Sequence, residues 1–289
     1  MIPFFAAALI LLLAAADDPE FGAPQPVTIT GYSGDAMEPF ITRDGSILIF
    51  NNLNDPPSET DLHWAKRIDD LTFAYRGKLQ GANSPALDAV ATVDSAANIY
   101  FVTTRSYEQD LMTIYRGHFE RGVVSDVAPV SGISRGVPGQ VNFDVEVSAD
   151  GNTLYFADGH FTRGAVPAQA DLAIAVRGSD GQFHRTDGAL LASVNTSALE
   201  YAACISEDQL ELFFTRIADG HSGIFRSTRA DRSSPWGAPR RLSAIIGFAE
   251  APTIAPGGSA LYYHAQRNGR MVIERVTRRP AAKRRAIRH

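Results

Sequence analysis

The stretch Ser148-Ala149-Asp150-Gly151-Asn152-Thr153-Leu154-Tyr155-Phe156 decides the fold, because related stretches return at four other places in the chain. Each copy joins a tight turn to an apolar run that ends in an aromatic residue, preceded by a second aromatic residue in four of the five copies. The last aromatic residues of the five copies are Phe50, Phe101, Phe156, Phe214 and Tyr263, at spacings of 51, 55, 58 and 49 residues. A period of this length predicts one supersecondary unit that stacks on copies of itself.

Each unit divides into four strand-like pieces. The first piece is rich in small residues, which suits a strand that lines a crowded central axis: Ala89, Ala91, Ala202, Ala203 and Ala251. The second piece is the aromatic-ended run, apolar at consecutive positions as expected of a strand covered on both faces. We therefore predict an all-β fold, a five-bladed β-propeller of four-stranded blades. The blades should span about 37–80, 86–130, 142–191, 198–243 and 249–277.

The last unit lacks its fourth piece, and the missing strand is at the other terminus. Phe21–Val27 repeats the pattern of Trp236–Leu242, which is the fourth strand of the preceding unit. We expect Gln25–Thr30 to form the outermost strand of the last blade. This join closes the ring and removes exposed strand edges.

These motifs carry a family resemblance. Ser148–Phe156, Glu250–Ile254 and Trp236–Pro239 resemble the TolB-like, WD40-like propeller repeats of bacterial envelope proteins, and the resemblance extends from Phe21 to about Thr277. It implies a propeller fold and a role in binding within the envelope. Gln209 replaces the turn glycine in the fourth unit, and TolB has six blades where five units are counted here.

The termini suggest export. Pro3–Ala16 is an uninterrupted apolar run that ends in small residues before Asp17, as in a secretory signal of residues 1–16. We therefore expect a periplasmic or secreted chain with no membrane span after processing. At the other end, the segment 278–289 carries six basic groups without apolar periodicity, so we expect a disordered basic tail that attaches to anionic envelope polymers.

Composition narrows the classes of partner. The net charge of -5 over 289 residues gives no bias toward nucleic acid. The single cysteine, Cys204, excludes an intrachain disulfide, and its apolar neighbours predict a small core residue rather than a nucleophile.

Acidic residues precede the first strand of several units. Counting back from Thr42, Thr92 and Ser148 places Glu38, Asp88 and Asp144 at one common position, and Glu200 and Glu250 come at similar offsets. Three interpretations are open. Each acid could order its own loop, the group could hold Ca²⁺ through Glu38, Asp88 and Asp144, or two or three of the five acids could act as acid and base on a glycosidic bond.

Other candidates are single residues or loops. Arg105 and Arg216 end aromatic strands and could bind an acidic partner or glycan, and His160 lies near Asp158. The segment Asn51–Asp61 is rich in oxygen ligands but lacks the spacing of a calcium loop. The sequence also contains no Gly-x-Ser-x-Gly elbow, phosphate-binding glycine loop or dinucleotide fingerprint.

The sequence thus favours a monomeric, non-enzymatic scaffold that binds a protein or glycan partner of the bacterial envelope, without a cofactor. The alternative is a carbohydrate-active hydrolase that uses the acids of the channel mouth. Carboxyl groups that converge would favour the enzyme, and acids bonded each to its own loop would favour the scaffold.

Overall fold

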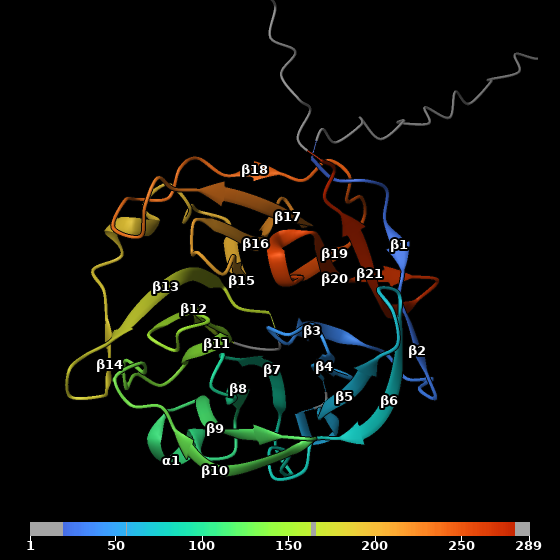
Figure 1. Cartoon of the computed structure of the whole chain (residues 1–289). Coiled ribbons are helices and arrows are strands. Elements are labelled where there is room, and N and C mark those ends of the chain that lie inside the picture. The colour runs from blue at the N-terminus through green and yellow to red at the C-terminus, as the bar shows by residue number, and fades with distance from the viewer. Residues whose placement is uncertain (1–19, 56, 163–165, 281–289) are drawn as a thin grey trace, which may run out of the picture.

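Five β-sheets surround a central axis in the computed structural model, which describes residues 20–55, 57–162 and 166–280 (Figure 1). In each sheet the strands follow one another outward from the axis, and neighbours pair antiparallel apart from one N-terminal strand described below. The predicted all-β fold of five four-stranded blades is confirmed.

The first three blades use consecutive strands. Blade one contains β3 (Met37–Ile41), β4 (Ile47–Asn51), β5 (Leu62–Arg67) and β6 (Thr72–Lys78). Blade two contains β7 (Asp88–Val93), β8 (Asn98–Thr103), β9 (Ile114–Glu120) and β10 (Val123–Pro129). Blade three contains β11 (Gln140–Val147), β12 (Thr153–His160), β13 (Gln169–Arg177) and β14 (Phe183–Arg185).

The last two blades bring the chain back to its start. Blade four contains β15 (Leu199–Ile205), β16 (Glu211–Ala218), β17 (His221–Thr228) and β18 (Arg240–Arg241). Blade five contains β19 (Ala249–Ile254), β20 (Ala260–Arg267), β21 (Arg270–Thr277) and, from the N-terminal side, β1 (Gln25–Pro26). The helical segments of the described chain are short and lie in loops: η1 (Pro57–Glu59), α1 (Tyr107–Asp110), η2 (Ala189–Leu191) and η3 (Pro256–Gly258).

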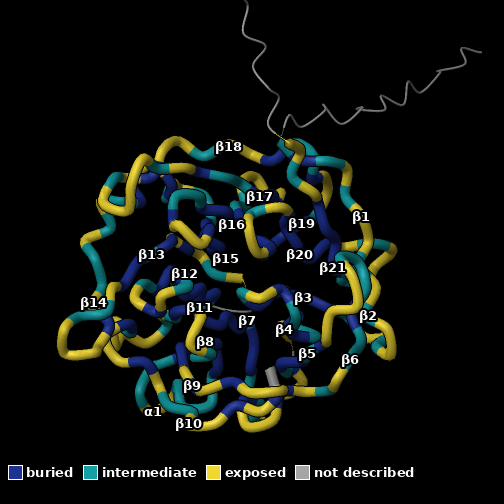
Figure 2. The backbone as a smooth tube through the Cα atoms, in the orientation of Figure 1, coloured by how far each residue is buried: buried dark blue, intermediate teal, exposed yellow. Residues whose placement is uncertain are grey.

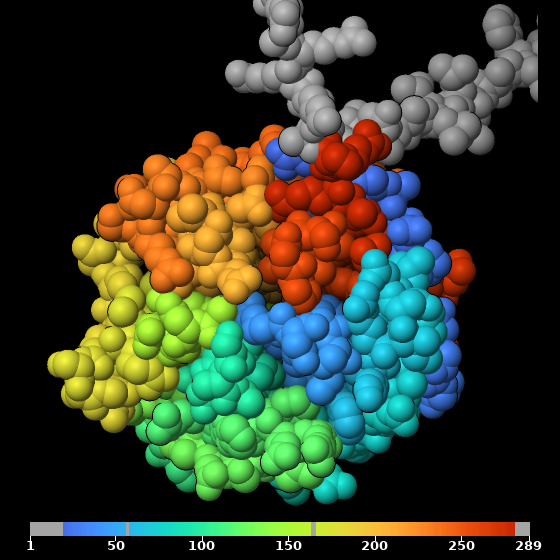
Figure 3. All heavy atoms as spheres, in the orientation of Figure 1, coloured from blue at the N-terminus to red at the C-terminus, as the bar shows by residue number. Residues whose placement is uncertain are grey.

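The aromatic ends of the second strands form the core. All five of the repeated aromatic residues are fully buried: Phe50, Phe101, Phe156, Phe214 and Tyr263. The core divides into clusters that join neighbouring blades; Phe101 of blade two, for example, belongs to the same cluster as Ile49 of blade one. Figure 3 shows the blades as adjoining sectors, and Figure 2 shows the buried residues around the axis and the exposed ones at the rim. Apolar burial between blades thus holds the ring together.

Ring closure differs in part from the expectation. Gln25 and Pro26 pair with Arg275 and Glu274 of β21, so the N-terminal strand completes the last blade as predicted. The following residues do not stay on that blade: β2 (Thr28–Thr30) pairs in parallel with β6 of blade one. The prediction that all of Gln25–Thr30 lies on blade five is therefore wrong. The chain crosses between two residues: the Val27 amide still donates to the Ile273 carbonyl of β21 at 2.9 Å, and the Thr28 amide donates to the Leu71 carbonyl beside β6 at 2.8 Å. The amide donors of Thr28–Thr30 thus serve the edge of blade one.

The start of the basic segment belongs to the folded body. The Arg278 amide donates to the Ser259 carbonyl at 2.8 Å, and its guanidinium donates to both carboxylate oxygens of Glu211 at 3.0 and 2.8 Å. The expected disordered tail therefore cannot begin at Arg278. Residues 281–289 and the expected signal, residues 1–16, lie outside the described residues. Within residues 20–280, apart from 56 and 163–165, no helix is long and apolar enough to cross a membrane.

Candidate functional site

Every inner strand contains a β-bulge at the same place. The residue at the bulge has a positive φ of 48 to 52° in all five blades: Glu38, Val90, Asp144, Ala202 and Ala251. At a bulge the backbone amide leaves the ladder of its own sheet. A buried amide needs another acceptor, and four of these five amides find one on the preceding blade.

Three side chains on second strands supply that acceptor. Asn51 Oδ1 accepts from the Val90 amide at 3.3 Å, Thr215 Oγ1 from the Ala251 amide at 2.9 Å, and His264 Nδ1 from the Glu38 amide at 3.3 Å. The Ala202 amide instead donates to the Asp144 carboxylate. Backbone satisfaction at the bulges thus draws Asp144 and His264 to one end of the channel.

Three carboxyl groups from three blades meet there, and we call Glu38, Asp144 and Glu250 the acidic mouth. His264 links two of them: its Nδ1 lies 3.9 Å from Glu38 Oε1, and its Nε2 lies 3.6 Å from Glu250 Oε2. The Tyr201 hydroxyl hydrogen-bonds to Glu250, and Asn54 Nδ2 donates to Glu38 Oε1 at 3.4 Å. Among the described residues, His264 is the only basic side chain within 4.0 Å of Glu38 or Glu250.

Burial gives these groups unusual acidities. It raises the pKa of Glu38 to about 8, with Asp144 and Glu250 adding to the rise and His264 and Asn54 opposing it. Burial also raises the pKa of Asp144 to about 7, and the charge of Glu250 contributes. For His264, burial disfavours the imidazolium, but Glu38 and Glu250 still bring its pKa above the usual value. Groups this close exchange protons as a unit.

The channel behind the acidic mouth is narrow. A cavity of about 30 Å³ is lined by Glu38, Asp144 and small residues of the inner strands, including Ala91, Ala202 and Ala251. This space is large enough for about two water molecules. The prediction that small residues line the axis is confirmed. A larger ligand can therefore meet the carboxyl groups only from outside, where the side chains of Glu38 and Glu250 are 5 and 11% exposed.

Asp88 and Glu200 lie apart from the acidic mouth, each in an ion pair within its own blade. Arg105 Nη2 lies 2.7 Å from Asp88 Oδ1, and Arg216 Nε lies 2.6 Å from Glu200 Oε1. Both acids are fully buried and also bind the preceding loop. The amide and hydroxyl of Ser84 donate to Asp88, and those of Thr196 donate to Glu200.

For Asp88 and Glu200, the interpretation that each acid orders its own loop holds. Arg105 and Arg216 are occupied by the same contacts, and both also lie over aromatic rings, Arg105 over Phe101 and Arg216 over Phe225.

The strand register explains why Asp88 was misplaced by counting. The amides of Thr42, Asp94 and Ser148 each donate across the turn that follows the first strand, so Asp94 is the counterpart of Thr42. Counting from Thr92 therefore shifted the second unit by two residues. The residue of blade two that corresponds to Glu38 and Asp144 is Val90, and the predicted equivalence of Asp88 with these acids is wrong.

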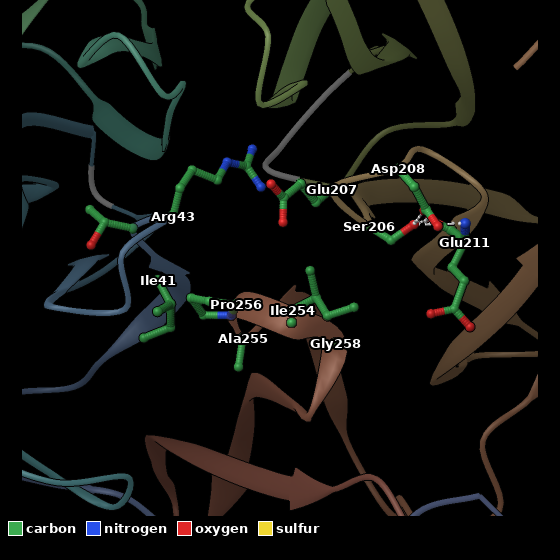
Figure 4. A pocket seen from close by; sticks show the side chains of 12 residues that line it. Ile41, Arg43, Ser206, Glu207, Asp208, Glu211, Ile254, Ala255, Pro256 and Gly258 are labelled. Atoms are coloured by element: carbon green, nitrogen blue, oxygen red, sulfur yellow. Dashed lines mark hydrogen bonds between the residues drawn. The ribbon is translucent and has the colours of Figure 1, made fainter. Parts of the chain in front are cut away.

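At the opposite mouth of the channel, an arginine compensates the charge of the buried carboxylate. Arg43 extends from the β3–β4 turn to blade three, where Nη2 lies 3.2 Å from Glu146 Oε1 and also donates to the Val147 carbonyl. Thr92 Oγ1 donates to the other oxygen of Glu146 at 2.7 Å. A pocket of about 500 Å³ lies at this mouth, and Figure 4 shows Arg43 reaching toward the turn that carries Glu207. The two ends of the channel thus differ in charge compensation.

His160 belongs to a separate polar pocket. The pocket, of about 360 Å³, lies on blade three and its flanking loops and is also lined by Asp158, Asp171 and Arg135. Asp158 accepts from Asn142 at 2.6 Å and pairs with Arg135 and Arg185. His160 is exposed and does not reach the acidic mouth.

The loop 51–61 contributes one residue to the site. Asn51 binds the Leu53 carbonyl and the Asn54 side chain, which holds Asn54 against Glu38. No group of three His, Cys, Asp or Glu side chains within the described residues is placed to hold a metal ion, and Asp88 is far from completing the Ca²⁺ set expected with Glu38 and Asp144. Cys204 is buried, and its thiol accepts from the Ile254 amide at 3.1 Å, which confirms it as a core residue.

Sequence reasoning missed His264 and Tyr201, whereas Asn54 lies in the oxygen-rich segment Asn51–Asp61. His264 follows the last aromatic residue of the fifth unit, as Asn51 follows that of the first. A polar residue directly after the buried aromatic residue was therefore the available signal. Tyr201 gave none, because its neighbours predict only an inner strand.

Comparison with known proteins identifies the fold alone. No family profile matches the chain, and no curated protein matches. A solved structure named "Glycoside hydrolase" aligns with a TM-score of 0.62 at 10% identity, covering 93% of this chain and 94% of that protein. A family 117 glycoside hydrolase of Zobellia galactanivorans aligns with a TM-score of 0.59 at 13% identity, covering 91% of this chain and 92% of that protein.

TolB of Acinetobacter baumannii is a more distant match. It aligns with a TM-score of 0.49 at 12% identity, covering 85% of this chain and 55% of that protein. That level of likeness carries no argument about function. The chain shares a propeller fold with the two glycoside hydrolases over most of its length.

Proposed function

We propose that this protein is a glycoside hydrolase whose acid and base lie in the acidic mouth. The observation that supports this most is the meeting of Glu38, Asp144 and Glu250 from three blades, without an arginine or lysine partner among the described residues. Uncompensated buried carboxyl groups are costly to a fold and are typical of sites where they do chemistry. The glycoside hydrolases named above share the fold, and this likeness agrees with the proposal.

The surroundings of the carboxyl groups assign the roles. Glu38 Oε2 is buried without a hydrogen-bond partner, and Glu38 stays protonated near neutral pH because its pKa is raised to about 8. Glu250 accepts from the Tyr201 hydroxyl and faces His264. Two carboxyl groups with unlike surroundings serve as acid and base.

The reaction follows from these roles. Glu38 gives its proton to the glycosidic oxygen as the bond from that oxygen to the anomeric carbon breaks. Glu250 takes a proton from the water that forms the new bond to that carbon. Asp144 accepts a hydrogen bond from the Ala202 amide. Its carboxylate places negative charge beside the positive charge that develops on the sugar ring.

The test is a hydrolysis screen of polysaccharides and aryl glycosides. We expect Glu38→Gln, Asp144→Asn and Glu250→Gln each to lower kcat/KM by about 10²-fold or more. Glu207→Gln, an exposed residue at the opposite mouth, makes the same chemical change and should retain activity. Equal activity in the three mouth variants, or no hydrolysis of any glycan by the folded wild type, would overturn the proposal.

The envelope-scaffold interpretation makes the opposite prediction. A scaffold would bind its protein or glycan partner equally well after Glu38→Gln, because exposed loops rather than buried carboxyl groups would make the contacts. Export also remains a proposal, checked by intact-mass analysis of the secreted chain, which should start at Asp17.

A further inference from the structure

One position on the second strand of each blade faces the bulge of the next blade. Strand register places these five residues in equivalent positions: Asn51, Val102, Ala157, Thr215 and His264. Where the residue is polar, it accepts the hydrogen bond of the next bulge amide, at Val90, Ala251 and Glu38 respectively. An asparagine or a threonine is therefore sufficient for the structural task.

His264 has a second nitrogen that this task does not use. Its Nε2 lies 3.6 Å from Glu250 Oε2, and it is buried without a hydrogen-bond partner. The ring is fully buried beside Phe248, with 5.9 Å between ring centroids. This nitrogen faces Glu250, so the histidine makes a contact that the structural task of blades one and four does not require.

The Glu38 amide fixes where the imidazole carries its proton. This amide donates to Nδ1, so Nδ1 must present a lone pair, and the proton of the neutral ring lies on Nε2. Moving the proton to Nδ1 would leave the Glu38 amide without an acceptor. The ring therefore directs its N–H toward Glu250, and shortening the contact by about 0.5 Å would give an ordinary hydrogen bond.

We propose that His264 is a positioning residue that makes Glu38 and Glu250 chemically unlike, by holding its Nε2 proton toward Glu250 and presenting only a lone pair toward Glu38. The groups that face it are Glu38 from blade one, Glu250 from its own blade, and Asp144 and Tyr201 from blades three and four. The catalytic meaning of this assignment rests on the proposed function. Glu38 Oε2 is buried without a hydrogen-bond partner, as expected if no donor of His264 reaches it.

The chain provides its own matched variants for the test. His264→Thr copies blade four, keeps an acceptor for the Glu38 amide and carries no nitrogen. His264→Asn copies blade one and keeps that acceptor together with a side-chain NH2 donor. His264→Val copies blade two and removes both. Thr215→Val removes the acceptor at the junction of blades four and five and serves as the control for lost stability alone.

The main readout does not depend on activity. Carbon NMR of side-chain carboxyl groups, assigned with Glu38→Gln and Glu250→Gln, gives the titration midpoints of the two residues. In His264→Thr the separation between these midpoints should shrink by about one pH unit or more. Thr215→Val should lower the melting temperature and leave the separation unchanged. An unchanged separation in folded His264→Thr would overturn the proposal.

The pH profile of hydrolysis provides the second readout. A bell-shaped profile of kcat/KM reports the pKa values of the acid and base of the free enzyme. In His264→Thr the two limbs of the profile should therefore move closer together by the same amount. If the wild type hydrolyses no glycan, the proposed function fails and the carboxyl titration still decides the role of His264. If the wild type is active and the width of the pH profile is unchanged in the His264 variant, the proposed role of His264 is wrong and the proposed function stands.

Discussion

Individual carboxyl groups in this propeller follow two different physical rules. Asp88 and Glu200 are fully buried, but each has an arginine and a loop amide, so their charge is compensated. Glu38 and Asp144 are also buried but have no arginine partner, and burial raises the pKa of both. Depth of burial alone does not distinguish a structural acid from a functional one. The distinction lies in whether hydrogen-bond donors and positive charges surround the carboxyl group.

The raised pKa values predict a stability that depends on pH. Glu38 and Asp144 have pKa values of about 8 and about 7 in the folded chain, above the usual values of 4.5 and 3.8. The folded state therefore binds more protons than the unfolded state between these limits, and their contribution is full at low pH and lost as the pH rises to 8. Glu38→Gln should be more stable than wild type at pH 9, by at least about 1.4 kcal/mol, the equivalent of one pKa unit.

Chemical denaturation at pH 5, 7 and 9 measures this difference. Glu207→Gln, which changes an exposed carboxyl group, should follow wild type at all three values. A Glu38→Gln variant whose stability relative to wild type does not rise with pH would show that Glu38 ionises normally in the fold.

At the scale of elements, the N-terminal strands join the first and last blades. β1 pairs with β21, and two residues later β2 pairs with β6, where the Thr28 amide donates to the Leu71 carbonyl at 2.8 Å. We expect Thr28→Pro to lower the free energy of unfolding by about 1–3 kcal/mol, because it removes a donor and leaves that carbonyl unpaired.

Thr28→Val is the matched control, since it keeps the amide and changes only the side chain. Thermal unfolding of both variants, with hydrogen exchange of β6, measures the effect. If Thr28→Pro unfolds at the temperature of Thr28→Val, the parallel pair does not contribute to closure.

At the scale of the whole molecule, ring closure depends on both ends of the described chain. The two ends leave the ring at one place beside β1 and β21 (Figure 1). Phe21 bridges to Arg278, whose guanidinium lies over the Phe21 and Phe213 rings and binds Glu211 of blade four. The boundary of the folded body is therefore after Arg278 rather than at Thr277.

Two truncations test this boundary. A chain ending at Thr277 loses the Arg278 contacts with Glu211 and Ser259, and should melt several degrees below the full chain, as expected for a loss of about 1–2 kcal/mol. A chain ending at Pro280 should have the same melting temperature as the full chain. Equal melting temperatures for both truncations would place the boundary at Thr277.

The sequence by itself determined the repeat, the number of blades and the strand that closes the ring, because these depend on local periodicity and turn chemistry. It also indicated Glu38, Asp144 and Glu250 as acids near one mouth. Only the tertiary structure decided which acids meet, because strand pairing fixes the equivalent positions of the blades. The turn hydrogen bonds make Asp94 rather than Thr92 the counterpart of Thr42, so Val90 occupies the position where Asp88 was expected. The β-bulge frees the Glu38 amide from its own sheet, and this amide donates to His264, a residue 226 positions away in the chain.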